Sequence, residues 1–233
     1  MRRFQALKQL GAFLLALRRA PVRRVWFKQV YFTGNEAGRL VALIGFSLGS
    51  ALILLLHGQY GQGKEAALRL MVHLVFTEFA PLFAALVLVA RSSSAVASEL
   101  AAMRVNRELA MLLRHGISLQ EYLIAPRVYG MTCAAIVLSA TLALCALLGG
   151  LFFASGWDVT YMLLRLEHVI RPSWCLIALA KAALFGFFAA VIACRCGLMA
   201  AAQPTEIPKA ASKAVMRGLA SVFALEFIWV LAA

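Results

Sequence analysis

Charged residues are scarce in this chain, and acidic residues are the scarcest. Only 14% of its 233 residues are Asp, Glu, Lys or Arg, whereas 63% are hydrophobic and the mean hydropathy is +0.85. An average soluble domain carries about 25% charged residues. The composition therefore excludes a soluble globular domain and indicates an integral membrane protein.

Groups that carry catalysis or hold metals are few and scattered. The five cysteines fall in or beside apolar stretches, Cys194 and Cys196 are too close together for a zinc pair, and the four histidines are dispersed. The stretch Gly58–Glu65 matches a phosphate-binding loop except at Glu65, where that loop requires Ser or Thr. We therefore expect no metal site, no catalytic residue and no nucleotide bound by this chain itself.

The gaps between charged residues mark the membrane spans. Two gaps contain no charge at all, from Arg39 to Lys64 and from Arg127 to Asp158, and each exceeds the roughly 20 residues that a helix needs to cross hydrocarbon. Three further apolar stretches each hold one charge away from their basic ends, namely Glu78, Lys181 and Glu226. We predict an all-α integral membrane protein with a single domain over 1–233. Its five predicted transmembrane helices cover about 38–58, 68–90, 123–154, 172–195 and 207–232.

The distribution of Lys and Arg predicts the orientation. With the N-terminus in the cytoplasm, eighteen Lys and Arg lie inside and four lie outside, in agreement with the excess of positive charge on cytoplasmic segments. We therefore predict the N-terminus inside and the C-terminus outside. Residues 1–30 combine basic ends with a short apolar stripe, which predicts an interfacial amphipathic helix that Pro21 ends. Anionic lipid explains the net charge of +13, and no nucleic-acid motif accompanies it.

Apart from the basic residues toward their ends, the predicted spans contain three charges, namely Glu78, Lys181 and Glu226. A rise of 1.5 Å per residue places each about 10–15 Å below the exterior end of its helix, in one layer. A charge at the centre of a span costs roughly 2.5–3.5 kcal/mol, so such residues pair with one another or face a wet cavity. We expect Lys181 to pair with Glu78 or Glu226 and the layer to line a polar pocket. An ion pair that only sets helix packing is the alternative.

The only extended polar helical segment, 91–121, lies between the second and third spans. Its apolar residues recur at helical spacing, Gly116 suits a helix end, and Ser118 with Glu121 has the spacing of a capping box. We predict a helix, a Gly hinge and a capped helix that leads into the third span, all on the cytoplasmic face. Such a segment either holds a partner or rests on lipid.

Two stretches of the chain carry a resemblance to a known family. The first comprises Pro81, Ala90-Arg91, Ser94-Ala95, Ala97, Glu99-Leu100, Met103-Arg104-Val105, Leu123 and Pro126-Arg127. The second comprises Lys181, Phe185-Gly186, Cys194, Gly197-Leu198, Ala210-Ala211-Ser212-Lys213-Ala214-Val215 and Leu225-Glu226-Phe227. In this order they resemble the signature of the MlaE/YrbE permeases of MCE-associated ABC transporters, from about residue 25 onward.

The resemblance implies a permease subunit in the bacterial inner membrane. Such a subunit moves phospholipid or a related lipid between that membrane and a periplasmic MCE protein, and so supports outer-membrane lipid asymmetry. The implied partners are a second permease copy, an ABC ATPase (MlaF-like), an MCE-domain protein (MlaD-like) and a STAS-domain protein (MlaB-like). ATP and Mg would be bound by the ATPase rather than by this chain.

The resemblance also assigns roles to particular residues. The implied lipid-cavity residues are Glu78, Lys181 and Glu226, with Thr77 and Pro81 beside them. The segment that begins at residue 91 becomes the coupling helix that contacts the ATPase. Its candidate contact residues are Arg91, Glu99, Met103, Arg104 and Arg107.

The chain departs from the family at two cavity positions. Thr77 stands where the family often has Arg, and Ala80 replaces the Gly of a Gly-Pro pair, so the expected headgroup contact changes. The residues alone leave two alternatives open. One is an ion-coupled secondary transporter that uses Glu78 and Glu226. The other is a membrane-embedded enzyme of lipid metabolism, which would need a nucleophile or metal cluster near those carboxylates.

Overall fold

The computed structural model describes residues 20–60, 64–155 and 171–232, and these ranges are helical apart from short links, with no strand among them. Three π-helical turns, η1 to η3, interrupt the α-helices. The elements are α2 (Ala20–Tyr60), α3 (Lys64–Leu74), η1 (Val75–Phe79), α4 (Ala80–Leu88), η2 (Val89–Ser93), α5 (Ser94–Val105), α6 (Glu108–Arg114), η3 (Gln120–Ile124), α7 (Ala125–Ser155), α9 (Pro172–Leu198) and α10 (Glu206–Ala232).

Five helices in the described part are long and apolar enough to cross a membrane, which confirms the all-α fold and the number of spans. They are Ala37–Leu56, Ala66–Val105, Gln120–Ala154, Pro172–Leu198 and Glu206–Leu231. The first, third, fourth and fifth agree closely with the predicted spans. The second is much longer than the predicted 68–90.

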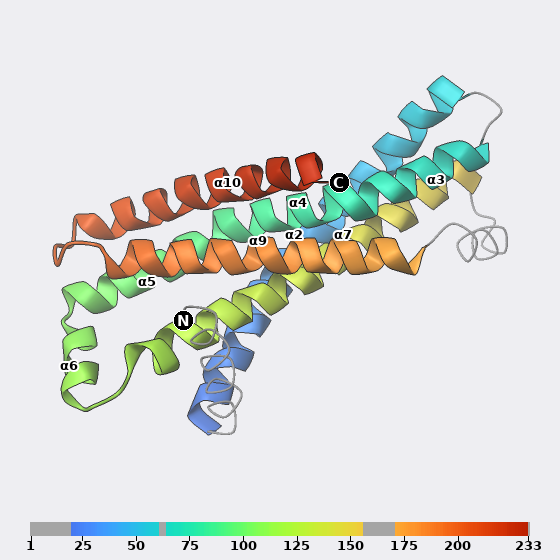
Figure 1. The fold of residues 1–233 in the computed structure, drawn as a ribbon. Coiled ribbons are helices and arrows are strands. Elements are labelled where there is room, and N and C mark those ends of the chain that lie inside the picture. Colours follow the sequence, from blue (N-terminus) through green and yellow to red (C-terminus); the bar gives the residue numbers. More distant parts are fainter. Residues whose placement is uncertain (1–19, 61–63, 156–170, 233) are drawn as a thin grey trace.

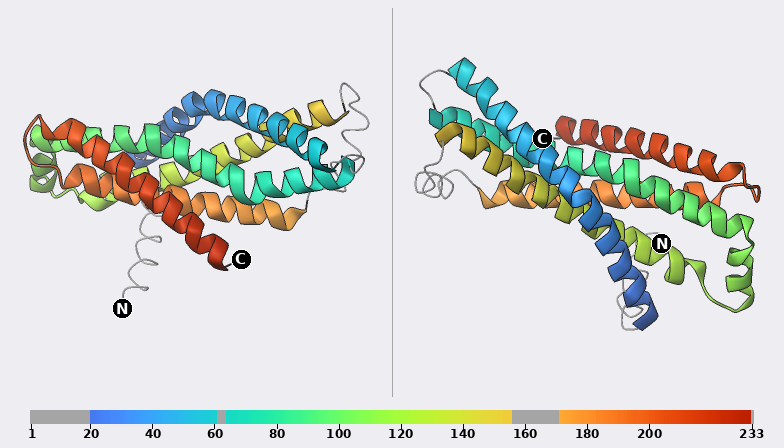
Figure 2. Two further views of the ribbon diagram at one scale, coloured as in Figure 1. Left: turned by 90° about the horizontal axis from the view of Figure 1, so that it is seen from above. Right: turned by 180° about the vertical axis from the view of Figure 1, so that it is seen from behind.

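Helices α2 and α7 cross at close range, as the oblique path of α2 in Figures 1 and 2 shows. Glycines make this approach possible. A Cβ on Gly49 would overlap the carbonyl of Ala146, and a Cβ on Gly149 would overlap the carbonyl of Phe46. Small residues at helix crossings let backbones approach, which is how membrane helices gain packing contacts without a hydrophobic driving force.

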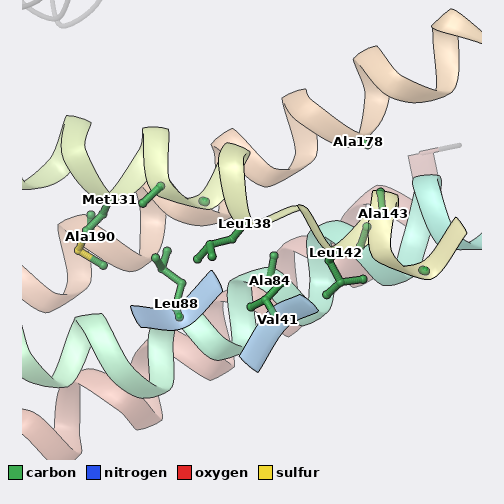
Figure 3. Packing of buried hydrophobic residues seen from close by; sticks show 14 of the residues in the cluster. Val41, Ala84, Leu88, Met131, Leu138, Leu142, Ala143, Ala178 and Ala190 are labelled. Atoms are coloured by element: carbon green, nitrogen blue, oxygen red, sulfur yellow. The ribbon is translucent and has the colours of Figure 1, made fainter. Parts of the chain in front are cut away.

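The main core lies where α4, α7 and α9 meet, with α2 on one side (Figure 3). Leu88 of α4 and Met131 and Leu138 of α7 are fully or almost fully buried there. Small residues such as Ala84 and Ala190 lie between them, so the three helices pack closely. This packing positions η1 and α4 against α9.

The chain from Lys64 to Val105 is one continuous helical path. The π-turns η1 and η2 connect α3, α4 and α5 without a non-helical residue between them. Pro81 is the only proline in this path. A proline ring clashes with the carbonyl four residues earlier, here that of Thr77, and this carbonyl lies in the wider turn η1, which ends two residues before Pro81. The π-turn therefore accommodates the proline without ending the helix.

The predicted segment 91–121 contains the helices α5 and α6, but no break separates α5 from the second span. Helix α5 continues the second span, and its inner face packs against α9 and α10 rather than lying free. A Cβ on Gly197 of α9 would lie 2.7 Å from the carbonyl oxygen of Ala97 and 2.7 Å from the Cβ of Leu100. Burial of this face by α9 and α10 explains why the helix does not stop at the serines.

Only α6 forms a separate short helix, reached through a turn in which Arg107 has φ 60°. Gly116 ends α6 with φ +73°, as predicted, because glycine tolerates the left-handed region. The capping box is not formed. No side chain caps the start of the next helix, and the Tyr122 N–H donates instead to the carbonyl of Ser118.

The predicted interfacial helix over 1–30 lies mostly outside the described residues. Its last part, from Ala20, belongs to α2 and continues without interruption into the first span, so no break separates them. Pro21 is in the first turn of α2, where a missing N–H costs little. The predicted orientation of the chain across the membrane stays a prediction.

Candidate functional site

Lys181 is fully buried and lies between two carboxylates. Its ammonium Nζ is 2.7 Å from Glu78 Oε2 and 2.8 Å from Glu226 Oε1, and it also donates to the Thr77 carbonyl at 3.0 Å. The pairing predicted from depth is thus confirmed, and it involves both glutamates rather than one. We call the Thr77 carbonyl, Glu78, Lys181 and Glu226 the outer cluster.

Three separate helices build the outer cluster, and each supplies one charge. Glu78 comes from η1, Lys181 from the first half of α9 and Glu226 from the last third of α10. Pro81 contributes indirectly: it has no N–H for the Thr77 carbonyl, which an α-helical residue 81 would satisfy, so that oxygen is available to Lys181.

The Thr77 hydroxyl is not available to bind a ligand. It is buried, and its hydroxyl donates to the carbonyl of His73 at 2.9 Å, within the same helical path. A hydroxyl used in this way offers a lipid no free donor. Thr77 therefore acts in the outer cluster through its backbone.

The two carboxylates differ in how open they are. The Glu78 side chain is 34% exposed and that of Glu226 is 15% exposed. Glu226 Oε2 is buried and has no hydrogen-bond partner among the described residues. Each N–H donor of Lys181 therefore has an acceptor within the cluster, whereas the carboxylates can still accept further hydrogen bonds.

An aromatic ring completes the outer cluster. Trp229 lies three residues after Glu226, on the same face of α10, and its ring centroid is 5.9 Å from Lys181 Nζ. A cation at this distance from an indole face gains electrostatic attraction. No sequence motif singled out Trp229, although its spacing from Glu226 could have done so.

A second ionic contact joins the polar segment to the third span. Arg127 Nη2 is 2.9 Å from Glu99 Oε1, with side-chain exposures of 8% and 59% respectively. We call Glu99 and Arg127 the inner pair. Arg127 belonged to the family motif but not to the candidate contact residues, because sequence gives no sign that α5 and α7 meet there.

The other candidate coupling residues lie in different surroundings. Arg104 is exposed and donates to the Leu198 carbonyl at the end of α9, and Met103 packs partly against the main core. Arg107 is exposed at the turn before α6. Arg91 is half-buried in η2. The structure thus does not gather these residues on one free face.

The described residues contain no group of three His, Cys, Asp or Glu side chains that could hold a metal. What the outer cluster offers is charge and hydrogen-bond acceptors within a bundle of apolar helices. Ionisable residues inside a membrane bundle mark substrate or ion pathways. Five helices long enough to span a membrane, with such a cluster among them, are typical of a polytopic membrane protein with a substrate or ion pathway.

Comparison with known proteins agrees with this class. Residues 26–232 match the model of the family described as Permease MlaE, so the chain belongs to the MlaE permease family. A probable ABC transporter permease protein of Rickettsia felis is 27% identical over 198 residues, which are 81% of this chain and 75% of the relative. A permease described in the same words from Synechocystis is 28% identical over 153 residues, 64% of this chain and 58% of the relative.

A plant relative is also similar. The chloroplastic protein TRIGALACTOSYLDIACYLGLYCEROL 1 of Arabidopsis thaliana is 26% identical over 157 residues, 65% of this chain and 44% of the relative. The family and its relatives make this chain a multi-pass membrane permease subunit of the ABC transporter type. Such a subunit works with an ATPase.

Proposed function

We propose that the chain moves phospholipid, or a related lipid, across or out of the bacterial inner membrane, with ATP and Mg bound by a separate ATPase. The observation that carries this proposal is the outer cluster, a buried charged group in an otherwise apolar bundle. Acyl chains fit against apolar helices, and a polar headgroup needs charged or hydrogen-bonding groups at one depth. The plant relative's name is that of a galactolipid, which supports lipid as the substrate class.

The proposed mechanism is alternating access driven by the ATPase. A ligand shifts a two-state equilibrium only when its affinity differs between the states, so ATP binding must reach the lipid cavity through a mechanical link. The inner pair joins α5 to α7, and α5 is continuous with η1, which carries Glu78. Movement of α5 would thus be transmitted along one helix to the outer cluster.

The proposed ATPase contact is α6 and its flanking turns rather than the inner face of α5. Met111 and Leu113 of α6 are exposed apolar residues, and Arg107 and Arg114 lie beside them. Apolar anchors surrounded by polar residues are typical of protein interfaces. The ATPase in this proposal is MlaF-like. The remaining proposed partners are a second permease copy, an MCE-domain protein on the periplasmic side (MlaD-like) and a STAS-domain protein on the ATPase (MlaB-like). The complete transporter would support outer-membrane lipid asymmetry.

Purification from the native membrane tests the partner assignment. Tagged full-length protein should bring down an ABC ATPase, and Met111→Glu should reduce its recovery more than tenfold. Gln120→Ala, which changes an exposed polar residue beyond α6, is the matched control and should leave recovery unchanged. Recovery of the chain without any ATPase would overturn the assignment.

Reconstitution of the purified complex in vesicles tests the lipid cavity. The variant with Glu78→Gln, Lys181→Met and Glu226→Gln replaces the outer cluster by neutral groups of similar shape, which in buried ion pairs is often tolerated. We expect this assembled variant to lose ATP-dependent transfer of a fluorescent phospholipid. Glu206→Gln with Lys209→Met removes an exposed ion pair on α10 and should transfer lipid normally. Full transfer by the neutral cluster would show that its role is structural.

A further inference from the structure

The hydrogen bonds of the outer cluster point to the kind of headgroup it can hold. An ammonium has three N–H donors, and those of Lys181 are matched by three acceptors, on Thr77, Glu78 and Glu226. None is left for a phosphate oxygen. The buried lysine is therefore not a free anion-binding group, although a lysine in a lipid cavity would first suggest one.

The capacity that remains is on the acids. Glu226 Oε2 is buried without a partner among the described residues, and about a third of the Glu78 side chain is exposed. A buried carboxylate oxygen without a hydrogen bond is costly. A ligand that brings a donor to this oxygen would remove that cost, whereas a ligand that brings another acceptor would not.

The balance of charge in the cluster leads to the same conclusion. The three charges come from residues 70–90, 172–194 and 218–233, and these stretches contain no Lys or Arg other than Lys181. The outer cluster thus combines one cation with two carboxylates and carries a net charge of −1 when both are ionised. A second cation would compensate it.

We propose that the outer cluster selects phospholipids whose headgroup ends in a primary ammonium, such as ethanolamine. This inference rests on the proposed function. The ammonium would donate to Glu226 Oε2 and to the exposed side of Glu78, with the Trp229 ring, which already faces Lys181, as an aromatic neighbour of the kind that favours cations. A choline headgroup is cationic but has no N–H, and a glycerol headgroup adds no positive charge.

The test measures which lipids the intact protein holds. The full-length complex is equilibrated in vesicles of equal parts ethanolamine, choline and glycerol phospholipid with the same acyl chains, and the bound lipid is identified by mass spectrometry. We expect ethanolamine phospholipid to be enriched roughly tenfold to a hundredfold over glycerol phospholipid, which is the range that one hydrogen bond to a charged group supplies. Choline phospholipid should lie between them.

Two comparisons assign the preference to the cluster. Glu226→Gln should abolish the enrichment while total bound lipid is retained, and Glu206→Gln on the same helix should not change it. In the unaltered protein, N-acetylated ethanolamine phospholipid should lose the enrichment, which tests the ammonium without any substitution. Equal binding of all headgroups, or enrichment of the glycerol lipid, would overturn the inference, whereas absence of any bound lipid would overturn the proposed function itself.

Discussion

Lys181 and Arg127 are both buried cations, but they lie at different depths in the bundle and differ in what is left unpaired. Lys181 has no exposed surface, and all its donors reach acceptors within the protein. Arg127 is paired with a glutamate that is 59% exposed, and its Nη1 is buried without a partner among the described residues. The outer cluster thus leaves acceptors free, and the inner pair leaves a donor free.

The exposure of the partners explains the difference. Lys181 has no exposed surface, so the protein itself must supply its compensating charge. Glu99 is more than half exposed and can keep its hydration, so the inner pair needs less compensation. The outer cluster is therefore suited to hold a ligand's charge, and the inner pair is suited to link two helices.

The largest effect is expected for Lys181→Met, which leaves two carboxylates facing each other inside the bundle. Loss of one partner of a buried ion pair costs about 3–5 kcal/mol. Denaturant titration of the purified chain, followed by tryptophan fluorescence, would measure this loss. Addition of Glu78→Gln and Glu226→Gln in the same chain should recover most of the stability. A single variant as stable as the unaltered protein would show that the cluster is hydrated.

The inner pair should respond asymmetrically to removal of its two partners. Glu99→Ala leaves the guanidinium of Arg127 buried without its acid and should cost about 2–3 kcal/mol, the penalty of an unsatisfied charged group. Arg127→Met leaves Glu99 in contact with solvent and should cost only about 1 kcal/mol. The same unfolding measurement compares them. Equal losses of unfolding free energy in the two variants would mean that Arg127 is no more buried than Glu99.

The smallest change in stability is expected for Pro81→Ala. The new N–H at position 81 would compete with Lys181 for the Thr77 carbonyl and weaken one hydrogen bond by about 0.5–1.5 kcal/mol. The higher helix propensity of alanine would offset this loss. Lipid transfer in vesicles should nevertheless fall several-fold, because the lysine is held less firmly. Pro208→Ala, in the first turn of α10, is the matched control, and an unchanged rate for Pro81→Ala would remove the proline from the site.

The depth of the three charged residues along their helices could be predicted from the sequence, but the direction in which each side chain points around its helix could not. Counting residues placed Glu78, Lys181 and Glu226 in one layer, and the structure joins all three. The same count could not show that Glu226 Oε2 stays unpaired, that Trp229 faces the lysine, or that the Thr77 hydroxyl turns to His73. These depend on how remote helices rotate against one another.

The class of the protein, its five spans and the common depth of its three intramembrane charges follow from the amino-acid sequence alone, because each depends on the hydropathy of a local stretch or on the fixed rise of a helix. Helix packing was needed to show that the second span continues through the serines to Val105, that both glutamates share Lys181, and that Glu99 reaches Arg127. The reason is that α9 and α10 pack against α5 and bury one of its faces. Such contacts join residues that lie far apart in the chain, so no local pattern predicts them.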